Sequence, residues 1–180
     1  MLMEAERSVL VVIDVQGRLA PAMQDPAPLL RNLAILMQAA STLEIPVVVT
    51  EQYPRGLGST LPDLAALAPA DAIVEKIEFS AARNDAFNRR LATLGRSDPI
   101  VCGIEAHVCV LQTALDLNER GMNTWLVTDA TASRSPANAA AAHARAGRQG
   151  VGLVTTEMAV FEWLRRADTP LFRKLSALIK

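Results

Sequence analysis

A cysteine at the start of a predicted helix is the side chain in this sequence best suited to nucleophilic chemistry. The segment 99–121 begins with an apolar run that stops at Gly103, and it resumes at Val108 with helical spacing. Cys109 therefore falls in the first turn of a helix that follows a strand. The backbone N–H groups of a helix start lack intrahelical partners and carry partial positive charge, so they favour a thiolate. The same N–H groups can stabilise an oxyanion that develops on a substrate carbonyl.

Cys109 can also have a purely structural role. Cysteine is among the most buried residue types, so Cys109 can also be a residue that only fills space in the core. Cys102 lies inside the apolar run, and we expect it to be a core residue. The two thiols are seven positions apart and form no C-x-x-C pair, which disfavours a redox-active pair.

Length and composition limit the classes of protein to which this chain can belong. Its 180 residues suffice for one domain, and we expect residues 1–180 to form a single one. Hydrophobic residues make up 51% and aromatic residues 4%, which predicts an aliphatic core. A net charge of −1 disfavours non-specific binding to nucleic acid, which needs a basic face. With two cysteines, two histidines and no Cys/His cluster, neither a disulfide framework nor a structural zinc site is expected.

The N-terminal segment resembles neither a signal peptide nor a membrane span. Residues 1–17 place acidic residues before an apolar run of five, whereas a signal peptide needs a basic start and a membrane span needs about 20 apolar residues. We therefore expect no membrane partner, and the cytoplasm is the expected compartment.

Apolar runs alternate with amphipathic segments along the whole chain. The runs predict strands, and the segments between and after them predict helices with apolar residues at helical spacing. The predicted strands span 9–13, 46–50, 72–75, 99–102, 124–128 and 151–155. The predicted helices span 28–43, 61–68, 84–94, 108–120, 135–148, 157–166 and 170–179, and a polar loop is expected over 51–58.

Continuous apolar strands that alternate with helices are typical of an α/β protein whose parallel sheet is covered on both faces. With right-handed crossovers, the pattern predicts a three-layer, doubly wound (Rossmann-like) sheet of the six predicted strands, all parallel, in the order 3-2-1-4-5-6. Strands one and four are neighbours in that order, and ligands bind at the carboxyl ends of the strands there. No G-x-G-x-x-G motif follows the first strand, so a dinucleotide site is disfavoured.

Three polar residues fall at the carboxyl ends of the predicted strands. Asp14 ends the first strand, Lys76 follows the third, and Cys109 opens the helix after the fourth. A carboxylate beside a thiol can accept its proton and later return it to a leaving group. A lysine favours both the thiolate and the ionised carboxylate. Taken singly, Asp14 can cap a loop and Lys76 can be a solvated charge, but the three together indicate a cysteine nucleophile.

At these residues the sequence resembles the isochorismatase-like cysteine hydrolases, a superfamily that includes nicotinamidases and N-carbamoylsarcosine amidohydrolases. The resemblance implies an Asp–Lys–Cys triad at Asp14, Lys76 and Cys109. The sequence is most similar to those of small, single-domain isochorismatase domain-containing members. The matching segments follow the family order over nearly the whole chain and are LVVIDVQGRL (10–19), VVVTEQYPRGLGST (47–60), EKIEFSA (75–81), VCGIEAHVCVLQTALDL (101–117), VTDATASR (127–134) and TTEMAVFE (155–162).

The resemblance also implies a particular backbone around the cysteine. It implies a non-proline cis peptide at Ile104–Glu105, directly after Gly103, and an oxyanion hole made by the backbone amides of Glu105 and Cys109. Each candidate for the substrate pocket can also be a structural neighbour; these candidates are Gln16, Tyr53, Phe79, Glu105 and His107.

One departure from the family pattern concerns metal binding. The nicotinamidases that the sequence resembles carry an Asp-x-His pair and a further histidine that hold a metal, whereas the corresponding segment 51–53 reads Glu-Gln-Tyr. The histidines of this chain are His107 and His143, and one histidine beside the site cannot make that centre. We therefore expect no catalytic metal and no other cofactor. His143 is expected to be a surface or hydrogen-bonded residue.

Together with the resemblance, these residues favour a metal-independent cysteine hydrolase that cleaves a small amide or a related C–N bond of a small-molecule substrate. The reaction would pass through a Cys109 thioester, with Asp14 as general base and then acid. A redox-active thiol protein and a ligand-binding domain without turnover remain open as alternatives. The resemblance and the apolar residues of the last helix predict a homo-oligomer; those residues are Leu171, Phe172, Leu175, Leu178 and Ile179.

Overall fold

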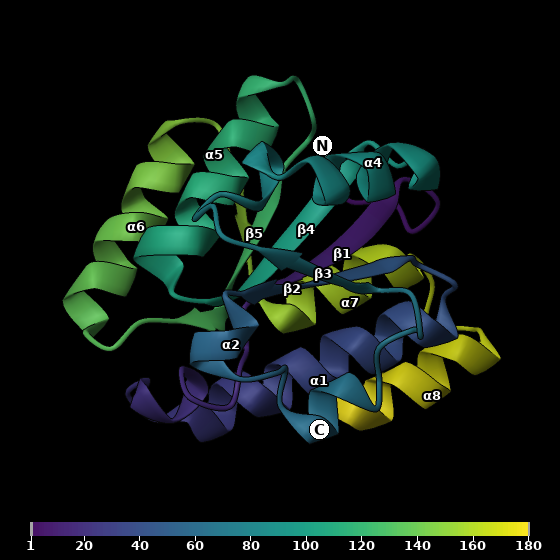
Figure 1. Cartoon of the computed structure of the whole chain (residues 1–180). Coiled ribbons are helices and arrows are strands. Elements are labelled where there is room, and N and C mark those ends of the chain that lie inside the picture. The colour runs from purple at the N-terminus through teal and green to yellow at the C-terminus, as the bar shows by residue number, and fades with distance from the viewer. Residues whose placement is uncertain (1, 180) are drawn as a thin grey trace.

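The computed structural model describes residues 2–179 and has a six-stranded β-sheet at its centre (Figure 1). The strand order is β3-β2-β1-β4-β5-β6, and every neighbouring pair is parallel, which confirms the predicted order. The strands are β1 (Ser8–Ile13), β2 (Val47–Gln52), β3 (Ile73–Lys76), β4 (Asp98–Ile104), β5 (Trp125–Ala132) and β6 (Gly152–Val154).

Helices cover both faces of this sheet, as predicted (Figure 1). Helices α1, α7 and α8 pack on one face, and α4, α5 and α6 pack on the other. No helix within residues 2–179 is long and apolar enough to cross a membrane. The helices are α1 (Pro26–Thr42), α2 (Pro54–Leu57), α3 (Pro62–Ala65), α4 (Asp85–Leu94), α5 (Leu111–Glu119), α6 (Pro136–Arg148), α7 (Thr156–Leu164) and α8 (Pro170–Ile179), with the short segments η1 (Ala20–Ala22), η2 (Ala81–Arg83) and η3 (Ala106–Val110).

Alternating side chains of the central strand divide the apolar core in two. Leu10 and Val12 of β1 pack toward α1, α7 and α8, whereas Val11 and Ile13 pack toward α4, α5 and α6. Every residue of β1 is buried, as expected for a parallel strand that is covered on both faces. Cys102 of β4 is fully buried with its sulfur 3.5 Å from the Val11 carbonyl oxygen, so its predicted place in the core is confirmed.

Strand β4 approaches β1 closely at the carboxyl end of the sheet. Gly103 pairs with Ile13 and has a φ of +109°. A Cβ atom at this position would lie 2.6 Å from the Ile13 nitrogen and closer still to the Ile13 carbonyl oxygen. Glycine is therefore required both by the backbone conformation and by the lack of space. The close pairing brings together the strand ends after which Asp14 and Glu105 leave the sheet.

Strand β5 is longer than the sequence predicts and runs to Ala132. Its pairing with β4 shifts along the strand, because Val101 faces Leu126 but Gly103 faces Thr131. The extra residues of β5 between these pairs form an irregularity of the β-bulge type. Such an interruption breaks the continuous apolar pattern on which the prediction of the strand end rested.

Two short helical segments also differ from the prediction. Helix α2 forms inside the segment 51–58 that was expected to be a polar loop, with Pro54 at its first position. The helical chain after β4 begins at Ala106, before the predicted start at Val108, because η3 is a π-helix that leads into α5. Short π-helical turns are rare, and apolar spacing of the regular helical period does not predict one.

Four of the five apolar residues of the last helix pack on their own chain, which corrects the expectation that they form a surface for a partner; the fifth, Leu171, is 43% exposed. Leu175 of α8 is fully buried, and Phe172, Leu178 and Ile179 pack against the core under α1. The ring of Phe172 also lies against Phe161 of α7, with the ring centroids 6.0 Å apart. The apolar stripe of this helix thus packs mainly on α1 and α7 of the same molecule.

Candidate active site

Asp14 and Lys76 form an ion pair at the carboxyl end of the sheet. Asp14 follows β1 and Lys76 ends β3, and β2 lies between those strands. The Lys76 Nζ atom lies 2.7 Å from Asp14 Oδ2, and both side chains are fully buried. A buried ion pair is stable only when its remaining donors and acceptors are also hydrogen-bonded.

Strand β2 supplies such hydrogen bonds through two residues that reasoning from the sequence missed. Thr50 Oγ1 donates to Asp14 Oδ1 at 2.6 Å, and Lys76 Nζ donates to Gln52 Oε1 at 2.6 Å. The Gln52 amide is oriented by its Nε2 atom, which donates to the Ile77 carbonyl oxygen at 2.9 Å. Thr50 and Gln52 are alternate residues on the strand between Asp14 and Lys76. The predicted strand order was therefore a signal that pointed to them.

Backbone carbonyl groups accept the remaining donor of Lys76. Its Nζ atom lies 3.2 Å from the Glu78 carbonyl oxygen and 3.4 Å from that of Phe79. A lysine ammonium has only three protons to donate, and Asp14, Gln52 and these carbonyls together engage them. Lys76 therefore acts on its surroundings beyond these partners through its charge.

Cys109 lies in η3 beside this ion pair, with 6% of its surface exposed. The Asp14 carboxylate lies close enough to the Cys109 thiol to favour the protonated sulfur. Burial and the negative charge of Asp14 raise the pKa of Cys109 to about 12, and the positive charge of Lys76 opposes them. The expectation that the helix start stabilises a thiolate is therefore wrong for the resting site. The thiol is protonated, and Asp14 stands next to its proton.

Glu105 ties the chain before Cys109 to the end of β5. The peptide bond between Ile104 and Glu105 is cis. The Glu105 Oε2 atom accepts hydrogen bonds from the Arg134 backbone nitrogen at 3.0 Å and from Arg134 Nε at 3.1 Å. Burial raises the pKa of the Glu105 carboxyl, but the hydrogen bonds and charge of Arg134 outweigh burial, so the pKa lies below its ordinary value. Arg134 belongs to the family-like segment 127–134 and was not singled out from the sequence.

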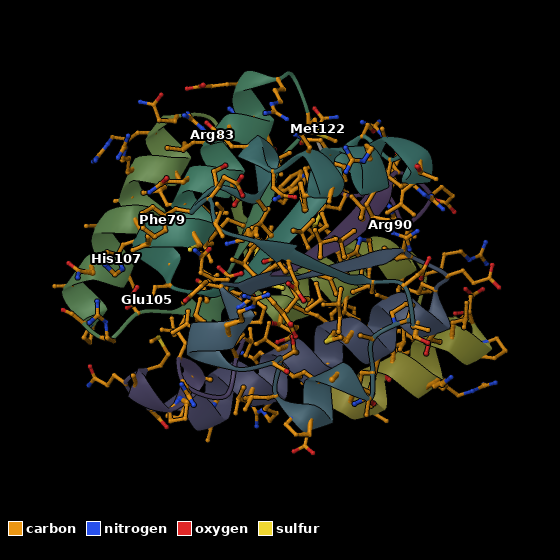
Figure 2. The ribbon with its side chains drawn as sticks, viewed as in Figure 1. Phe79, Arg83, Arg90, Glu105, His107 and Met122 are labelled. Carbon is orange, nitrogen blue, oxygen red and sulfur yellow. The ribbon has the colours of Figure 1, made fainter. Side chains whose placement is uncertain are left out.

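His107 links the same part of the site to α6. Its Nδ1 atom lies 2.9 Å from Ser133 Oγ, and its Nε2 atom lies 3.4 Å from Asn138 Nδ2. Helix α6, which carries Asn138, packs against η3. Figure 2 shows Glu105 and His107 at this side of the molecule, beside α6. The ring is partly exposed and is held by Ser133, which follows β5, and by Asn138 of α6.

Gln16 and His143 are held by the fold itself. Gln16 is fully buried, and its Nε2 atom donates to the carbonyl oxygens of Gln52 at 3.0 Å and Gly58 at 2.6 Å. Its Oε1 atom accepts from the Gln52 backbone nitrogen at 2.8 Å, so both amide atoms are bound to backbone groups at the end of β2 and at Gly58. His143 Nε2 lies 2.8 Å from Thr131 Oγ1, which agrees with the expected hydrogen-bonded role.

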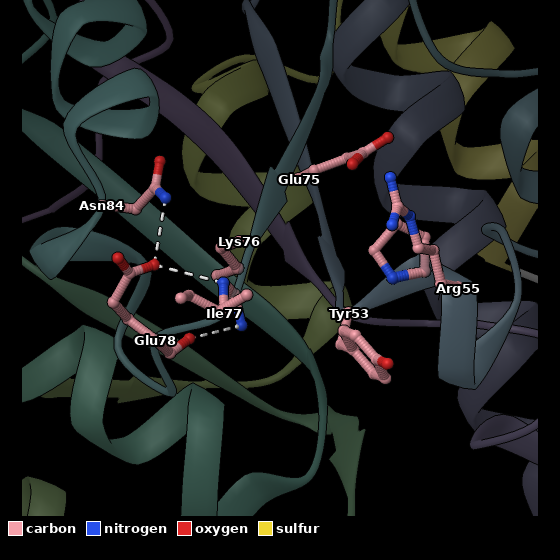
Figure 3. A pocket seen from close by; sticks show the side chains of 8 residues that line it. Tyr53, Arg55, Glu75, Lys76, Ile77, Glu78 and Asn84 are labelled. Atoms are coloured by element: carbon pink, nitrogen blue, oxygen red, sulfur yellow. Dashed lines mark hydrogen bonds between the residues drawn. The ribbon is translucent and has the colours of Figure 1, made fainter.

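An open cavity of about 530 Å³ lies at the β3 edge of the sheet, beside Lys76 (Figure 3). Figure 3 shows Tyr53 and Arg55 on one side of it and Glu78 and Asn84 on the other. Asp14 and Cys109 do not line this cavity, so it reaches Lys76 and does not open onto the thiol. Tyr53 and Phe79 are 55% and 56% exposed. The cavity is lined by Tyr53, Pro54, Arg55, Glu75, Lys76, Ile77, Glu78 and Asn84.

The chain matches the isochorismatase domain model over residues 8–158. Isochorismatase domain-containing protein 2 of Danio rerio is 38% identical to it over 177 residues, which cover 96% of this chain and 86% of that protein. This chain belongs to the isochorismatase family. Isochorismatase domain-containing protein 2A of Mus musculus is 35% identical over 178 residues, which cover 97% of this chain and 84% of that protein. Membership of the isochorismatase family supports a hydrolase-type function.

Solved structures share the isochorismatase-family fold of this chain. MAR1 ribonuclease from Caenorhabditis elegans is 35% identical and matches with a TM-score of 0.92 over 99% of this chain and 92% of that chain. The YcaC gene product from Escherichia coli matches with a TM-score of 0.93 over 99% of this chain and 90% of that chain. Because its identity is 23%, the YcaC likeness shows the fold alone.

The residues of this isochorismatase-family chain do not fit the metal centre that the nicotinamidases carry. Glu51 follows Thr50 and points to the opposite face of β2, where its Oε1 atom accepts from the nitrogen and the hydroxyl of Thr60, both at 2.7 Å. The Gln52 side-chain oxygen is bound to Lys76. Within residues 2–179, no group of three or more His, Cys, Asp or Glu side chains is placed to hold a metal ion.

Proposed function

We propose that this protein is a metal-independent cysteine hydrolase that cleaves a small amide or a related C–N bond. The observation that carries the proposal is the buried Asp14–Lys76 ion pair, whose carboxylate lies close enough to the Cys109 thiol to act on its proton. A protonated thiol beside a fixed carboxylate suits a nucleophile that a general base activates. The hydrolase-type function of the family supports the same reaction class.

In the first half of the proposed reaction, Asp14 takes the proton of Cys109 and the sulfur attacks the carbonyl carbon of the substrate. The backbone N–H groups of Glu105 and Cys109 hold the oxyanion of the tetrahedral intermediate. The C–N bond then breaks, and the leaving nitrogen takes the proton from Asp14. Ammonia or an amine departs, and the acyl group remains on Cys109 as a thioester.

In the second half, a water molecule attacks the thioester while Asp14 accepts one of its protons. The C–S bond breaks, the sulfur recovers the proton from Asp14, and a carboxylic acid departs. Lys76 keeps its charge through both halves. Its bonds to Gln52 and to two backbone carbonyls hold the ammonium beside Asp14.

A screen of small amides with the purified protein tests this function. Ammonia release is measured for the wild type, for Cys109→Ala and for Cys102→Ala as the matched thiol control. We expect Cys109→Ala to lower kcat/KM at least about 1000-fold, and Cys102→Ala to keep the activity because its side chain lies in the core. Intact-mass measurement of the quenched enzyme should show an acyl adduct on Cys109.

Other outcomes of the same screen identify other functions. Hydrolysis that persists in Cys109→Ala would contradict the proposed nucleophile. Saturable binding without turnover, equal in the wild type and Cys109→Ala, would indicate a ligand-binding domain. A reversible Cys102–Cys109 disulfide in mild oxidant would indicate a redox protein. Because one solved relative is named MAR1 ribonuclease, RNA belongs in the screen, and RNA cleavage that does not need Cys109 would also count against the proposal.

Self-assembly of the chain is a second part of the proposal. Strand β3 is at the edge of the sheet, and beside it Ile73 and Ile77 are 43% and 75% exposed. Exposed apolar side chains that cluster at an edge are typical of a surface that a partner covers. The E. coli YcaC protein, which shares this fold, is described as an octameric hydrolase. Light scattering after size exclusion tests the assembly, and a monomer at micromolar concentration would contradict it.

A further inference from the structure

Thr50 holds Asp14 at two points. The Asp14 backbone nitrogen donates to the Thr50 carbonyl oxygen at 3.1 Å, and Thr50 Oγ1 donates to Asp14 Oδ1 at 2.6 Å. Thr50 is fully buried. A β-branched side chain has few χ1 rotamers on a strand, so the direction of the hydroxyl is restricted. The hydroxyl therefore stays aimed at one oxygen of the carboxylate.

The carboxylate of Asp14 has a separate donor on each oxygen. Thr50 donates to Oδ1 and Lys76 donates to Oδ2. The Cys109 thiol thus neighbours a carboxylate whose two oxygens are each already bound by a donor. Hydrogen bonds from fixed donors favour a carboxylate over a carboxylic acid, because the charged acceptor binds them more strongly. Both donors thus keep the shared proton on sulfur.

We propose that Thr50 is a positioning residue that sets how readily the proton passes from Cys109 to Asp14. The proposal deepens the hydrolase function above and rests on it. In the transfer the S–H bond breaks, an O–H bond forms on Asp14, and the electron pair remains on sulfur. The charged groups that act on Cys109 besides Asp14 are Lys76 from β3 and Glu105 from the chain after β4. Thr50 is the uncharged donor to Asp14, and it adjusts this balance without adding a charge.

The Thr50 hydroxyl has opposite effects on the two uses of that proton. By favouring the carboxylate it holds the thiol protonated, which slows thiolate formation. Because the hydroxyl favours the ionised carboxylate, it also makes protonated Asp14 a better proton donor to the leaving nitrogen. Removal of the hydroxyl should therefore speed direct chemical modification of Cys109 while it slows turnover. A merely structural loosening at Thr50 would also expose the buried Cys109 and speed its modification, but it would do so whether or not Asp14 is present.

Alkylation of Cys109 by iodoacetamide at fixed neutral pH tests the proposal, with peptide mass spectrometry as the readout. Thr50→Val keeps the side-chain shape and removes the hydroxyl, and Thr50→Ser restores a hydroxyl. We expect Thr50→Val to raise the alkylation rate on the order of tenfold, the weight of one hydrogen bond to a charged group, and Thr50→Ser to return it to the wild-type rate. Thr50→Ala removes the same hydroxyl without added bulk and replaces Thr50→Val if that variant does not fold.

The route through Asp14 is tested in an Asp14→Asn background. There Thr50→Val should leave the alkylation rate unchanged, because the proton acceptor is gone. A Thr50→Val rate at or below the wild-type rate, or a full increase that persists with Asp14→Asn, would overturn the proposal. Labelling needs no substrate of the hydrolase. Failure of every amide to turn over, with labelling as expected, would therefore refute the hydrolase function and not the role of Thr50.

Discussion

The site has two halves that are held in different ways. The inner half is built on β1, β2 and β3, and the outer half surrounds the chain after β4. In the inner half, Asp14 and Thr50 are fully buried and Lys76 is 3% exposed. In the outer half, Glu105 is 7% exposed, but the side chain of its partner Arg134 is 65% exposed. The inner half consists of Asp14, Thr50, Gln52 and Lys76, and the outer half of Glu105, His107, Cys109 and Arg134.

This difference in burial determines how each half responds when a side chain loses its ion-pair or hydrogen-bond partner. Asp14, Thr50 and the Lys76 ammonium are almost fully shielded from water, so an ion or donor that loses its partner there remains unsatisfied. Water does reach the outer half, and it replaces part of any hydrogen bond that a substitution removes. The inner half is therefore suited to moving a proton in a fixed environment. The outer half, with partly exposed side chains, is suited to meeting a substrate.

The largest expected effect is on the inner half, for Lys76→Met. The substitution leaves the Asp14 carboxylate buried without its counter-ion, so we expect the free energy of unfolding to fall by about 3–5 kcal/mol. Urea denaturation at neutral pH measures it. Lys174→Met on the exposed side of α8 is the matched control and should cause no measurable change. The double variant Asp14→Asn/Lys76→Met should recover part of the lost stability, because it no longer buries an unpaired carboxylate. A loss below about 1 kcal/mol in Lys76→Met alone would contradict the proposed difference between the two halves.

A smaller effect is expected in the outer half, for Arg134→Ala. The variant loses the guanidinium contact to Glu105, which is partly solvated, so we expect a loss of about 0.5–1 kcal/mol at neutral pH. Folding lowers the pKa of Glu105, so the stability that this carboxyl contributes is present above its unfolded pKa and is lost as the pH falls through its folded pKa. The difference between the wild type and Arg134→Ala should therefore disappear in acid.

Urea unfolding at neutral pH and at about pH 3 measures that pH dependence. Arg166→Ala is the matched control, because Arg166 pairs with Asp168 on the surface, and it should cause no measurable change at neutral pH. A difference between wild type and Arg134→Ala that grows in acid would show that Arg134 stabilises the protein by another route than the Glu105 carboxylate.

The smallest effect is expected for His107→Ala. The ring is partly exposed and touches Ser133 and Asn138, so its loss should change the free energy of unfolding by only a few tenths of a kcal/mol. If the proposed pocket is correct, the effect on turnover should fall mainly on KM, which steady-state kinetics separates from kcat. Asn138→Ala removes one of the same contacts and is the control for a purely structural effect. An unfolding loss as large as that of Lys76→Met would contradict the division into halves.

Much of the fold followed from local pattern. The predicted strand order was correct because each strand of a parallel sheet is a continuous apolar run that is visible in the sequence. The same order indicated that Asp14 and Cys109 come close, and in the structure the Asp14 charge acts directly on the Cys109 thiol. The bulge in β5 and the π-helix η3 escaped prediction because each interrupts the regular spacing on which the pattern depends.

Side-chain partners were less predictable. Gln16 was a candidate for the pocket, but it is buried and its amide binds the backbone of Gln52 and Gly58. The sequence could not predict this, because a glutamine near a strand end looks the same whether it contacts substrate or backbone. Thr50 was not chosen, because a threonine in an apolar strand is an ordinary β-former. The roles proposed from the sequence for Tyr53, Phe79 and His107 in the substrate pocket stay predictions.

By itself, the sequence determined the order of the strands and the residues that stand at their carboxyl ends, because these depend on periodicities within short segments. The tertiary structure decided the state of those residues. The Cys109 thiol is protonated because burial and the Asp14 charge outweigh the helix start and Lys76. Its neighbours come from separate strands, and the strength of each charge depends on how much water remains between them. The burial of Cys109 and its distances from the Asp14 and Lys76 charges are set only when the strands assemble into the sheet.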